Sequence, residues 1–285
     1  MALLELVLQV AAVVVACHLL GLLAVLDPGA LRAGWSRARS NLSTVLFEAV
    51  ALGAVLSING LVRDVSVELS WMIGVNITAQ ISGVEGRLVA HLQSVASPPL
   101  TVYFASVYVF GYVFLLTFPL VAYVLHSESR PLRVLLVAYI LNYTVGLLCY
   151  VLFVAYGPRN FMPELVEPLL FTSWPQSQLL TRQVNVNTNV FPSLHASLSV
   201  TVALVAYRFR TVHRRWVPVA GVLAASIAVS TMYLGIHWVT DVVAGTVVAA
   251  LSVAVALRTT ASEGPDRRRW SGVRTVRRWL ESVGR

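Results

Sequence analysis

Long apolar runs constrain this chain more than any other feature of its sequence. A helix needs about 20 predominantly apolar residues to cross the hydrocarbon core of a bilayer. Runs near that length cover residues 3–26, 42–62, 101–125, 132–155, 193–209, 217–235 and 237–257. With 57% apolar and only 12% charged residues, the 285-residue chain is too apolar for a water-soluble domain. The sequence therefore predicts an all-α polytopic membrane bundle of seven spans.

The predicted spans divide the chain into three parts. We expect an N-terminal transmembrane helix with its loop over 1–41, a six-helix catalytic core over 42–257, and a basic tail over 258–285. Within residues 63–100, an apolar residue recurs every three or four positions, which predicts a helix lying in the membrane interface as a lid or a connector. The recurring residues are Ile81, Val84, Leu88, Leu92 and Val95.

The basic residues set the expected orientation. All 21 of them are Arg, and they give a net charge of +8. The groups after the first, third, fifth and seventh spans are Arg32, Arg37 and Arg39; Arg130 and Arg133; Arg208, Arg210, Arg214 and Arg215; and the arginines of the tail. Because a seven-span chain places these groups on one side, the positive-inside rule makes that side cytoplasmic and the N-terminus external. The charge pattern therefore indicates membrane topology and lipid head groups as partners, and no nucleic acid.

A histidine and an aspartate four residues apart mark the start of the last span. The stretch Ser-Thr-Met-Tyr-Leu-Gly-Ile-His-Trp-Val-Thr-Asp runs from Ser230 to Asp241. On a helix, His237 and Asp241 would share one face, so the carboxylate would accept a hydrogen bond from the imidazole. That bond fixes the tautomer and leaves the other ring nitrogen free to attack an electrophile. The alternative is a histidine that only hydrogen-bonds its own helix turn.

A second polar stretch supports the catalytic alternative. Pro192 suits the first turn of a helix, where the N–H groups of Ser193, Leu194 and His195 would be unpaired and would bind an anion such as phosphate. Arg159, at the end of the fourth span, would add a bidentate contact. His195 would then protonate the leaving group while His237 attacks from the opposite side.

Together these residues resemble the membrane branch of the type 2 phosphatidic acid phosphatase and vanadium haloperoxidase superfamily. The family's second motif is Pro-Ser-Gly-His, and its third is Ser-Arg, five residues, His, three residues, Asp. Here the matching residues are Pro192-Ser193-Leu194-His195, and Ser230, His237 and Asp241. The resemblance, over 42–257, implies that Ser193 binds phosphate, with Ser230 a weaker candidate. It also implies general acid His195, nucleophile His237 and its orienting partner Asp241, with no metal or cofactor.

The sequence departs from the family at its cations. The chain has no Lys, so Leu152 stands in the place of the first-motif Lys, and Thr231 replaces the Arg of the third motif. Arg159 is the best substitute cation and Arg182 a weaker one. Leu194 followed by Ala196 is similar to the inositol phosphorylceramide synthase-like subgroup, which transfers a phospho-headgroup to an alcohol.

These observations predict a lipid phosphatase that cleaves a phosphoester or pyrophosphate at the extracytoplasmic face through a phosphohistidine. The close alternative is a phosphotransferase that uses a polyol or lipid alcohol as acceptor. Two further alternatives are a metal site made of His195, His237 and Asp241 and a lipid-binding relative without catalysis. The sequence leaves the lipid substrate and the oligomeric state open.

Overall fold

The computed structural model describes residues 2–26, 28–181 and 190–261. Its helices are α1 (Ala2–Val25), α2 (Pro28–Thr44), α3 (Leu46–Ile73), α4 (Thr78–Glu85), α5 (Leu88–Gln93), α6 (Pro98–Ser106), α7 (Tyr112–Val124), α8 (Arg130–Leu152), α9 (Pro158–Phe161), α10 (Leu169–Ser173), α11 (Ser177–Thr181), α12 (Leu194–Arg208), α13 (Trp216–Tyr233) and α14 (Val239–Thr259). A π-helical turn, η1 (Val107–Gly111), joins α6 to α7. Two short strands, β1 (Val75–Asn76) and β2 (Phe153–Val154), pair in parallel. The all-α bundle predicted from the sequence is confirmed.

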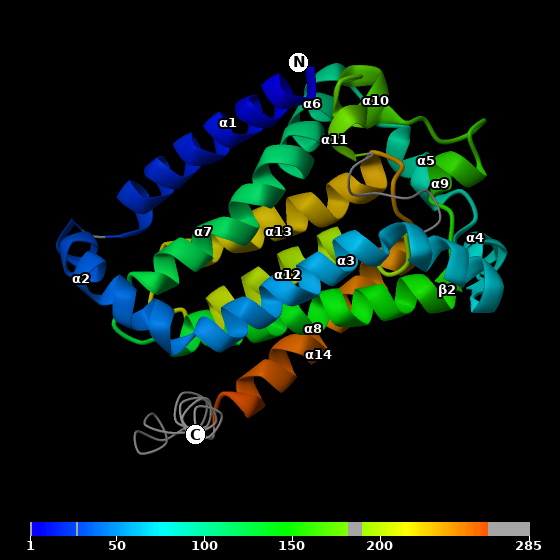
Figure 1. Cartoon of the computed structure of the whole chain (residues 1–285). Coiled ribbons are helices and arrows are strands. Elements are labelled where there is room, and N and C mark those ends of the chain that lie inside the picture. The colour runs from blue at the N-terminus through cyan, green and yellow to red at the C-terminus, as the bar shows by residue number, and fades with distance from the viewer. Residues whose placement is uncertain (1, 27, 182–189, 262–285) are drawn as a thin grey trace, which may run out of the picture.

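Most of the predicted spans are long, apolar helices. Five helices have the length and composition to cross a bilayer: Leu3–Val25, Pro98–Val124, Arg130–Leu152, Trp216–Tyr233 and Val239–Thr259. A sixth candidate is the pair Leu31–Thr44 and Leu46–Leu61, bent by 67° at its break. The chain is therefore an integral membrane protein, whose helices are arranged as Figure 1 shows.

Two predicted spans differ from the observed helices. The run predicted at 42–62 belongs to α3, which starts at Leu46 and continues to Ile73. The run at 193–209 forms α12, a helix of only 15 residues. At 1.5 Å per residue α12 is about 22 Å long, shorter than the roughly 30 Å hydrocarbon core. The apolar run is longer than its helix because Ser193 acts as the N-cap rather than as a helical residue.

Helix α12 lies in the core, against α8, α13 and α14. Leu198, Val202 and Val205 of α12 are buried in the main hydrophobic cluster. Gly245 of α14 allows close approach, because a Cβ there would lie 2.4 Å from the carbonyl oxygen of Ser193. Small residues permit such contacts between membrane helices, which depend on close packing. The packing therefore fixes the start of α12 against α14.

The N-terminal helix α1 is peripheral to this core. It packs on α7, where Thr117 Oγ1 lies 3.2 Å from His18 Nε2. In an 18-residue window of α1 only 11% of residues are buried. Figure 1 shows α1 alongside α7 with its other side open. The outward apolar side chains of α1 therefore face lipid.

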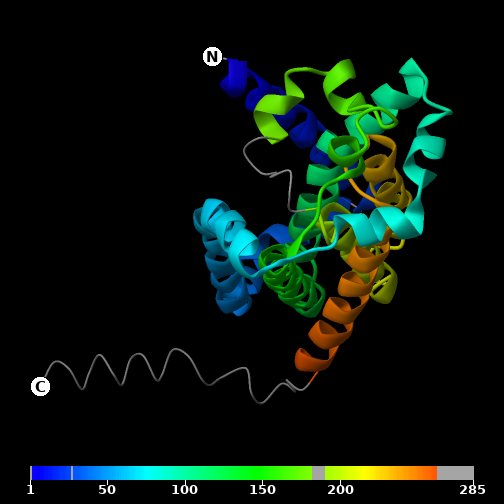
Figure 2. The same cartoon turned by 90° about the vertical axis from the view of Figure 1, so that its right-hand side faces the viewer.

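The prediction of a single interfacial helix around 81–95 is wrong in its details. Helices α4 and α5 replace it, separated at Gly86, whose φ of +57° favours glycine. Ile81 and Val89 are buried, whereas Val84 is 85% exposed. The break at Gly86 interrupts the helical periodicity, so the predicted apolar stripe does not form one face. Figures 1 and 2 show these short helices at one end of the bundle.

Candidate active site

His237 and Asp241 meet at the start of α14. His237 Nδ1 lies 3.3 Å from Asp241 Oδ2, and both side chains are buried. His237 precedes the N-cap, Trp238, so the two do not share a helix face as expected from their spacing. The pair forms because Asp241 folds back over the helix start, where its Oδ2 also accepts the N–H of Trp238 at 2.9 Å. The contact predicted from the spacing is present, but a helix cap produces it.

The turn before His237 is held from both sides. The N–H groups of Ile236 and His237 donate to the carbonyl of Thr231 at 3.0 Å each. Gly235, with φ of +72°, makes the turn possible because other residues are strained there. These bonds orient the backbone that carries His237.

Glu85 reaches the same helix start from α4. Its Oε2 accepts the N–H of Val239 at 2.9 Å, and its Oε1 accepts the N–H of Thr240. These N–H groups have no partner within a helix, so a carboxylate at this end satisfies them and interacts favourably with the helix dipole. Sequence analysis missed Glu85, since nothing in the mixed 63–100 segment links it to a residue 154 positions away.

The second motif caps α12, with one correction to the expected pattern. Pro192 lies before the helix, not in its first turn, and Ser193 is the N-cap. Ser193 Oγ accepts the N–H of Ala196 at 3.3 Å, while the Ser193 N–H donates to the Asp241 carbonyl at 3.0 Å. The Ser193 N–H is therefore unavailable to a ligand. The N–H groups of Leu194 and His195 have no hydrogen-bond partner among the described residues.

His195 lies between two tyrosines that sequence analysis missed. Its ring stacks on Tyr108 at a centroid distance of 4.5 Å and an angle of 17°, and lies 4.2 Å from Tyr112. The π-helical turn η1 carries Tyr108, and such turns are frequent at functional sites. The spacing of four between the tyrosines, within an apolar span, is the signal that sequence analysis left unused.

Arg159 approaches the same region from α9. Its backbone N–H donates to the carbonyl of Gly235 at 3.1 Å, which ties α9 to the turn before His237. Its guanidinium lies 4.5 Å from the centre of the Phe171 ring, and burial lowers the pKa of Arg159, an effect that nearby Tyr108 opposes. Nη1 of Arg159 is buried without a hydrogen-bond partner in the described part of the chain. A buried, unpaired N–H of a cation is a ready donor to an anion.

The remaining candidates are less directly placed. Ser230 is buried, and its hydroxyl donates to the Ile227 carbonyl within α13 at 2.7 Å. Thr231 likewise donates its hydroxyl to Ala228 at 2.7 Å. Leu152 is the last residue of α8 and is 40% exposed. Because it is apolar, it supplies no cation at the position of the first-motif Lys. Arg182 lies outside the described residues.

The donor geometry does not support the metal-site alternative. Among residues 2–26, 28–181 and 190–261, no group of three or more His, Cys, Asp or Glu side chains lies close enough to hold a metal ion.

Comparisons with known proteins identify the family. A protein-family model described as the PAP2 superfamily matches residues 81–255, which is more than half of the chain. Searches of curated proteins and of solved structures gave no match. The matched region contains Glu85, Tyr108, Arg159, His195 and His237, and the other described residues of the candidate site. The chain therefore belongs to the PAP2 superfamily, whose members are generally phosphatases.

Proposed function

We propose that this protein is a lipid phosphatase that hydrolyses a phosphoester or pyrophosphate at the extracytoplasmic face through a phosphohistidine intermediate. The observation that carries the proposal is the buried His237–Asp241 pair, at 3.3 Å, in the same site as the unpartnered Nη1 of Arg159. A paired histidine supplies a nucleophile, and an unpaired buried cation supplies an anion contact. Membership of the PAP2 superfamily supports the reaction class.

His237 is the proposed nucleophile. When its Nδ1–H donates to Asp241, the lone pair of the neutral ring lies on Nε2, which attacks phosphorus. The negative carboxylate then stabilises the cationic ring as the Nε2–P bond forms. Its bond to the Trp238 N–H holds the carboxylate in place, so the ring has a defined orientation.

The phosphate oxygens have two proposed sources of donors. The Arg159 guanidinium provides charge, and the N–H groups of Leu194 and His195 provide dipoles at the start of α12. Burial strengthens these interactions because the local dielectric constant is low. Arg159 thereby replaces the cations that the family motifs place at Leu152 and Thr231.

His195 is the proposed general acid. As the Nε2–P bond forms, the bond between phosphorus and the leaving oxygen breaks, and His195 protonates that oxygen. Neutral His195 then accepts a proton from water, whose oxygen attacks phosphorus and displaces Nε2. Phosphate leaves, and both histidines return to their starting protonation states. Tyr108 and Tyr112 hold the His195 ring between them.

The orientation is also a proposal. Arg37 in α2 and Arg130, Arg208 and Arg215 near the ends of α8, α12 and α13 belong to the end of the bundle opposite to α9. By the positive-inside rule that end faces the cytoplasm, which puts the candidate site at the outer face.

A second candidate function is phospho-headgroup transfer to an alcohol, as in the inositol phosphorylceramide synthase-like subgroup. The favouring observation is Leu194, which stands where most family motifs have Gly. A Cβ added to Gly146 of α8 would lie 2.6 Å from Leu194 Cδ2. The glycine therefore leaves room on α8 for the larger side chain. In this reaction an alcohol replaces water in the second step.

The test uses detergent-purified protein with chelator present. A panel of radiolabelled lipid phosphates and diphosphates is incubated with and without polyol acceptors. The variant is His237→Ala, and the matched control is His91→Ala, an exposed histidine that bonds only its own helix. We expect wild type and control to release free phosphate and His237→Ala to release none. A labelled adduct formed only with acceptor would assign the transferase, whereas turnover by His237→Ala in chelator would refute the phosphohistidine.

A further inference from the structure

Gln93, the last residue of α5, joins three segments of the chain through its side-chain amide. Its Nε2 donates to the main-chain carbonyls of Glu167 and Tyr233 at 2.9 Å each, and its Oε1 accepts the N–H of Glu167 at 2.9 Å. Because an amide oxygen only accepts and an amide nitrogen only donates, these three contacts fix the orientation of the amide. Gln93 therefore holds the backbone of Glu167 against the end of α13.

Both partners of Gln93 belong to segments that carry the candidate active site. Glu167 lies in the connection from α9, the helix of Arg159, to α10. Tyr233 is the last residue of α13 and comes shortly before Gly235, whose carbonyl accepts the Arg159 N–H at 3.1 Å. Figure 1 shows α5, α9 and α10 at the same end of the bundle. The Gln93 amide and the Arg159 N–H therefore attach the α9–α10 segment to the end of α13 at two places.

The turn between α13 and α14 packs directly on these contacts. A Cβ on Gly235 would lie 3.0 Å from the Glu167 carbonyl oxygen and 3.2 Å from Gln93 Nε2. It would also lie 2.8 Å from Cγ1 of Val166, a buried residue in one hydrophobic cluster with Trp238, the N-cap of α14. Because closely packed groups transmit strain, a displacement of Glu167 would also displace this turn.

Phe171 supports the side chain of Arg159. The guanidinium carbon of Arg159 lies 4.5 Å from the centre of the Phe171 ring, within the range of a cation–π interaction. Phe171 itself belongs to α10 and packs in a hydrophobic cluster with Leu170, Tyr233 and Leu234. Nη1 of Arg159 has no hydrogen-bond partner in the described ranges of the chain. The ring therefore supports the guanidinium and leaves Nη1 available to an anion.

We propose that Gln93 and Phe171 are positioning residues, which hold Arg159 at a fixed place relative to His237. The inference rests on the proposed function, in which Arg159 binds the phosphate that His237 attacks. An arginine side chain has many rotamers, and ordering it on binding costs free energy. Holding the guanidinium in place beforehand lowers this cost and keeps the phosphorus atom aligned with the nucleophile. Gln93 places the α9–α10 segment on the turn, and Phe171 places the guanidinium within that segment.

The test is a double-mutant cycle on kcat/KM, measured in detergent on the most rapidly hydrolysed member of the panel of lipid phosphates and diphosphates. Gln93→Met keeps a long, unbranched side chain and removes all three hydrogen bonds, and Phe171→Leu removes the ring. Each is made alone and together with Arg159→Ala. The control for the first is Gln176→Met, at an exposed glutamine between α10 and α11.

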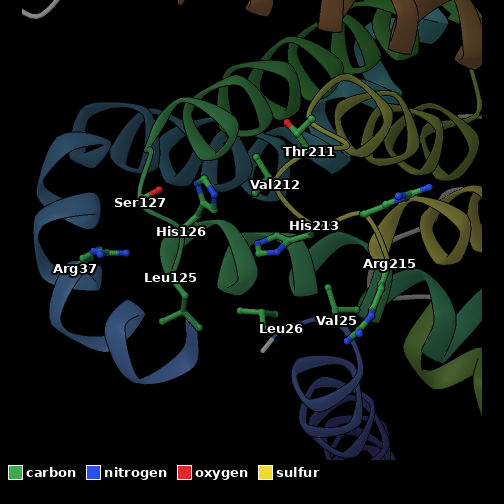
Figure 3. A pocket seen from close by; sticks show the side chains of 11 residues that line it. Val25, Leu26, Arg37, Leu125, His126, Ser127, Thr211, Val212, His213 and Arg215 are labelled. Carbon is green, nitrogen blue, oxygen red and sulfur yellow. The ribbon is translucent and has the colours of Figure 1, made fainter. Parts of the chain in front are cut away.

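Two further variants complete the set. Phe171→Tyr keeps an aromatic ring beneath the guanidinium. Arg37→Ala removes an exposed arginine at the opposite end of the bundle, where Figure 3 shows Arg37 beside a pocket of about 450 Å³. It is the control for the loss of a positive charge far from the candidate active site. Thermal unfolding shows which variants are folded, and the Phe171 variants test the proposal even when Gln93→Met does not fold.

We expect Gln93→Met and Phe171→Leu each to lower kcat/KM roughly tenfold, and Phe171→Tyr to lower it less. In the Arg159→Ala background either change should cost less than about twofold, because the group that they position is gone. A merely structural role would give the same loss in both backgrounds. That result, or wild-type kcat/KM in Gln93→Met or Phe171→Leu, would overturn this inference alone. Near-normal kcat/KM in Arg159→Ala, or no turnover by wild type, would also contradict the proposed function.

Discussion

The N–H of Ser193 donates to the main-chain carbonyl of Asp241 at 3.0 Å, and this bond joins the two sequence motifs directly. The N-cap of α12 is thereby fixed to the first turn of α14, beneath the Asp241 side chain that contacts His237. Gly245 permits this approach, since a Cβ there would meet the Ser193 carbonyl oxygen at 2.4 Å. One helix contact therefore sets the position of His195 relative to His237.

Asp241→Asn should remove most activity without unfolding the protein. The amide oxygen can still accept the Trp238 N–H, but it cannot stabilise a cationic His237 as a carboxylate does. We expect kcat to fall roughly 10³-fold or more, by analogy with other acid–histidine pairs. Steady-state kinetics beside a thermal unfolding curve make the measurement. A variant with normal kcat would show that Asp241 only caps α14.

Arg159→Ala should weaken substrate recognition. The backbone bond to Gly235 persists, so the loss falls on the guanidinium contact to the phosphate. We expect kcat/KM to fall roughly 30- to 150-fold, which corresponds to a loss of about 2–3 kcal/mol of transition-state stabilisation. Arg159→Lys, which keeps the charge and loses the bidentate geometry, should recover part of this. Near-normal kcat/KM in Arg159→Ala would place phosphate binding elsewhere, with Arg182 the next candidate.

Glu85→Ala should lower both stability and kcat, because two N–H groups at the start of α14 lose their acceptor. The loss of such caps costs about 1–2 kcal/mol of unfolding free energy. Since Glu85 acts through the position of His237, KM should change less than kcat, and Glu85→Gln, which keeps one acceptor oxygen, should be intermediate. Glu164→Ala, at an exposed acid of the same end, serves as the control. Unchanged kcat with lower stability would restrict Glu85 to a structural role.

His213 should make stability depend on pH below neutrality. Burial lowers the pKa of His213; the Ala122 carbonyl opposes this effect and the nearby His126 adds to it. Because the unfolded chain takes up the proton first, stability is full above the unfolded value of about 6.5 and falls as the pH drops below it.

The measurement is thermal unfolding between pH 7.5 and pH 5 without phosphate. We expect wild type to lose more stability over this interval than His213→Gln, whose amide can still donate to Ala122. The control is His91→Gln, at an exposed position. Parallel pH profiles for wild type and His213→Gln would contradict this assignment.

Local patterns made much of this architecture predictable. The apolar runs identified the membrane helices, because the bilayer sets their length. The spacing of His237 and Asp241 predicted their contact, although the contact arises from a helix cap rather than from a shared helix face. Pro192 was placed in the first turn of the helix, whereas it lies directly before the N-cap, because the serine after it is a preferred N-cap residue.

The features that could not be predicted are those that join distant segments. Glu85 reaches α14 across 154 positions, and no local pattern indicates the π-helical turn that carries Tyr108. The break between α4 and α5 depends on a positive φ at Gly86, which a periodic apolar pattern does not reveal.

The most direct test of the catalytic proposal is to trap the covalent intermediate. Protein in detergent with chelator is mixed with a ³²P-labelled lipid phosphate, quenched in alkali within milliseconds and digested, and the label is located by mass spectrometry, with His237→Ala and His91→Ala alongside. The proposal predicts base-stable, acid-labile label on His237 in wild type and in His91→Ala, and none in His237→Ala. Turnover without label on His237, or equal label in His237→Ala, would contradict it.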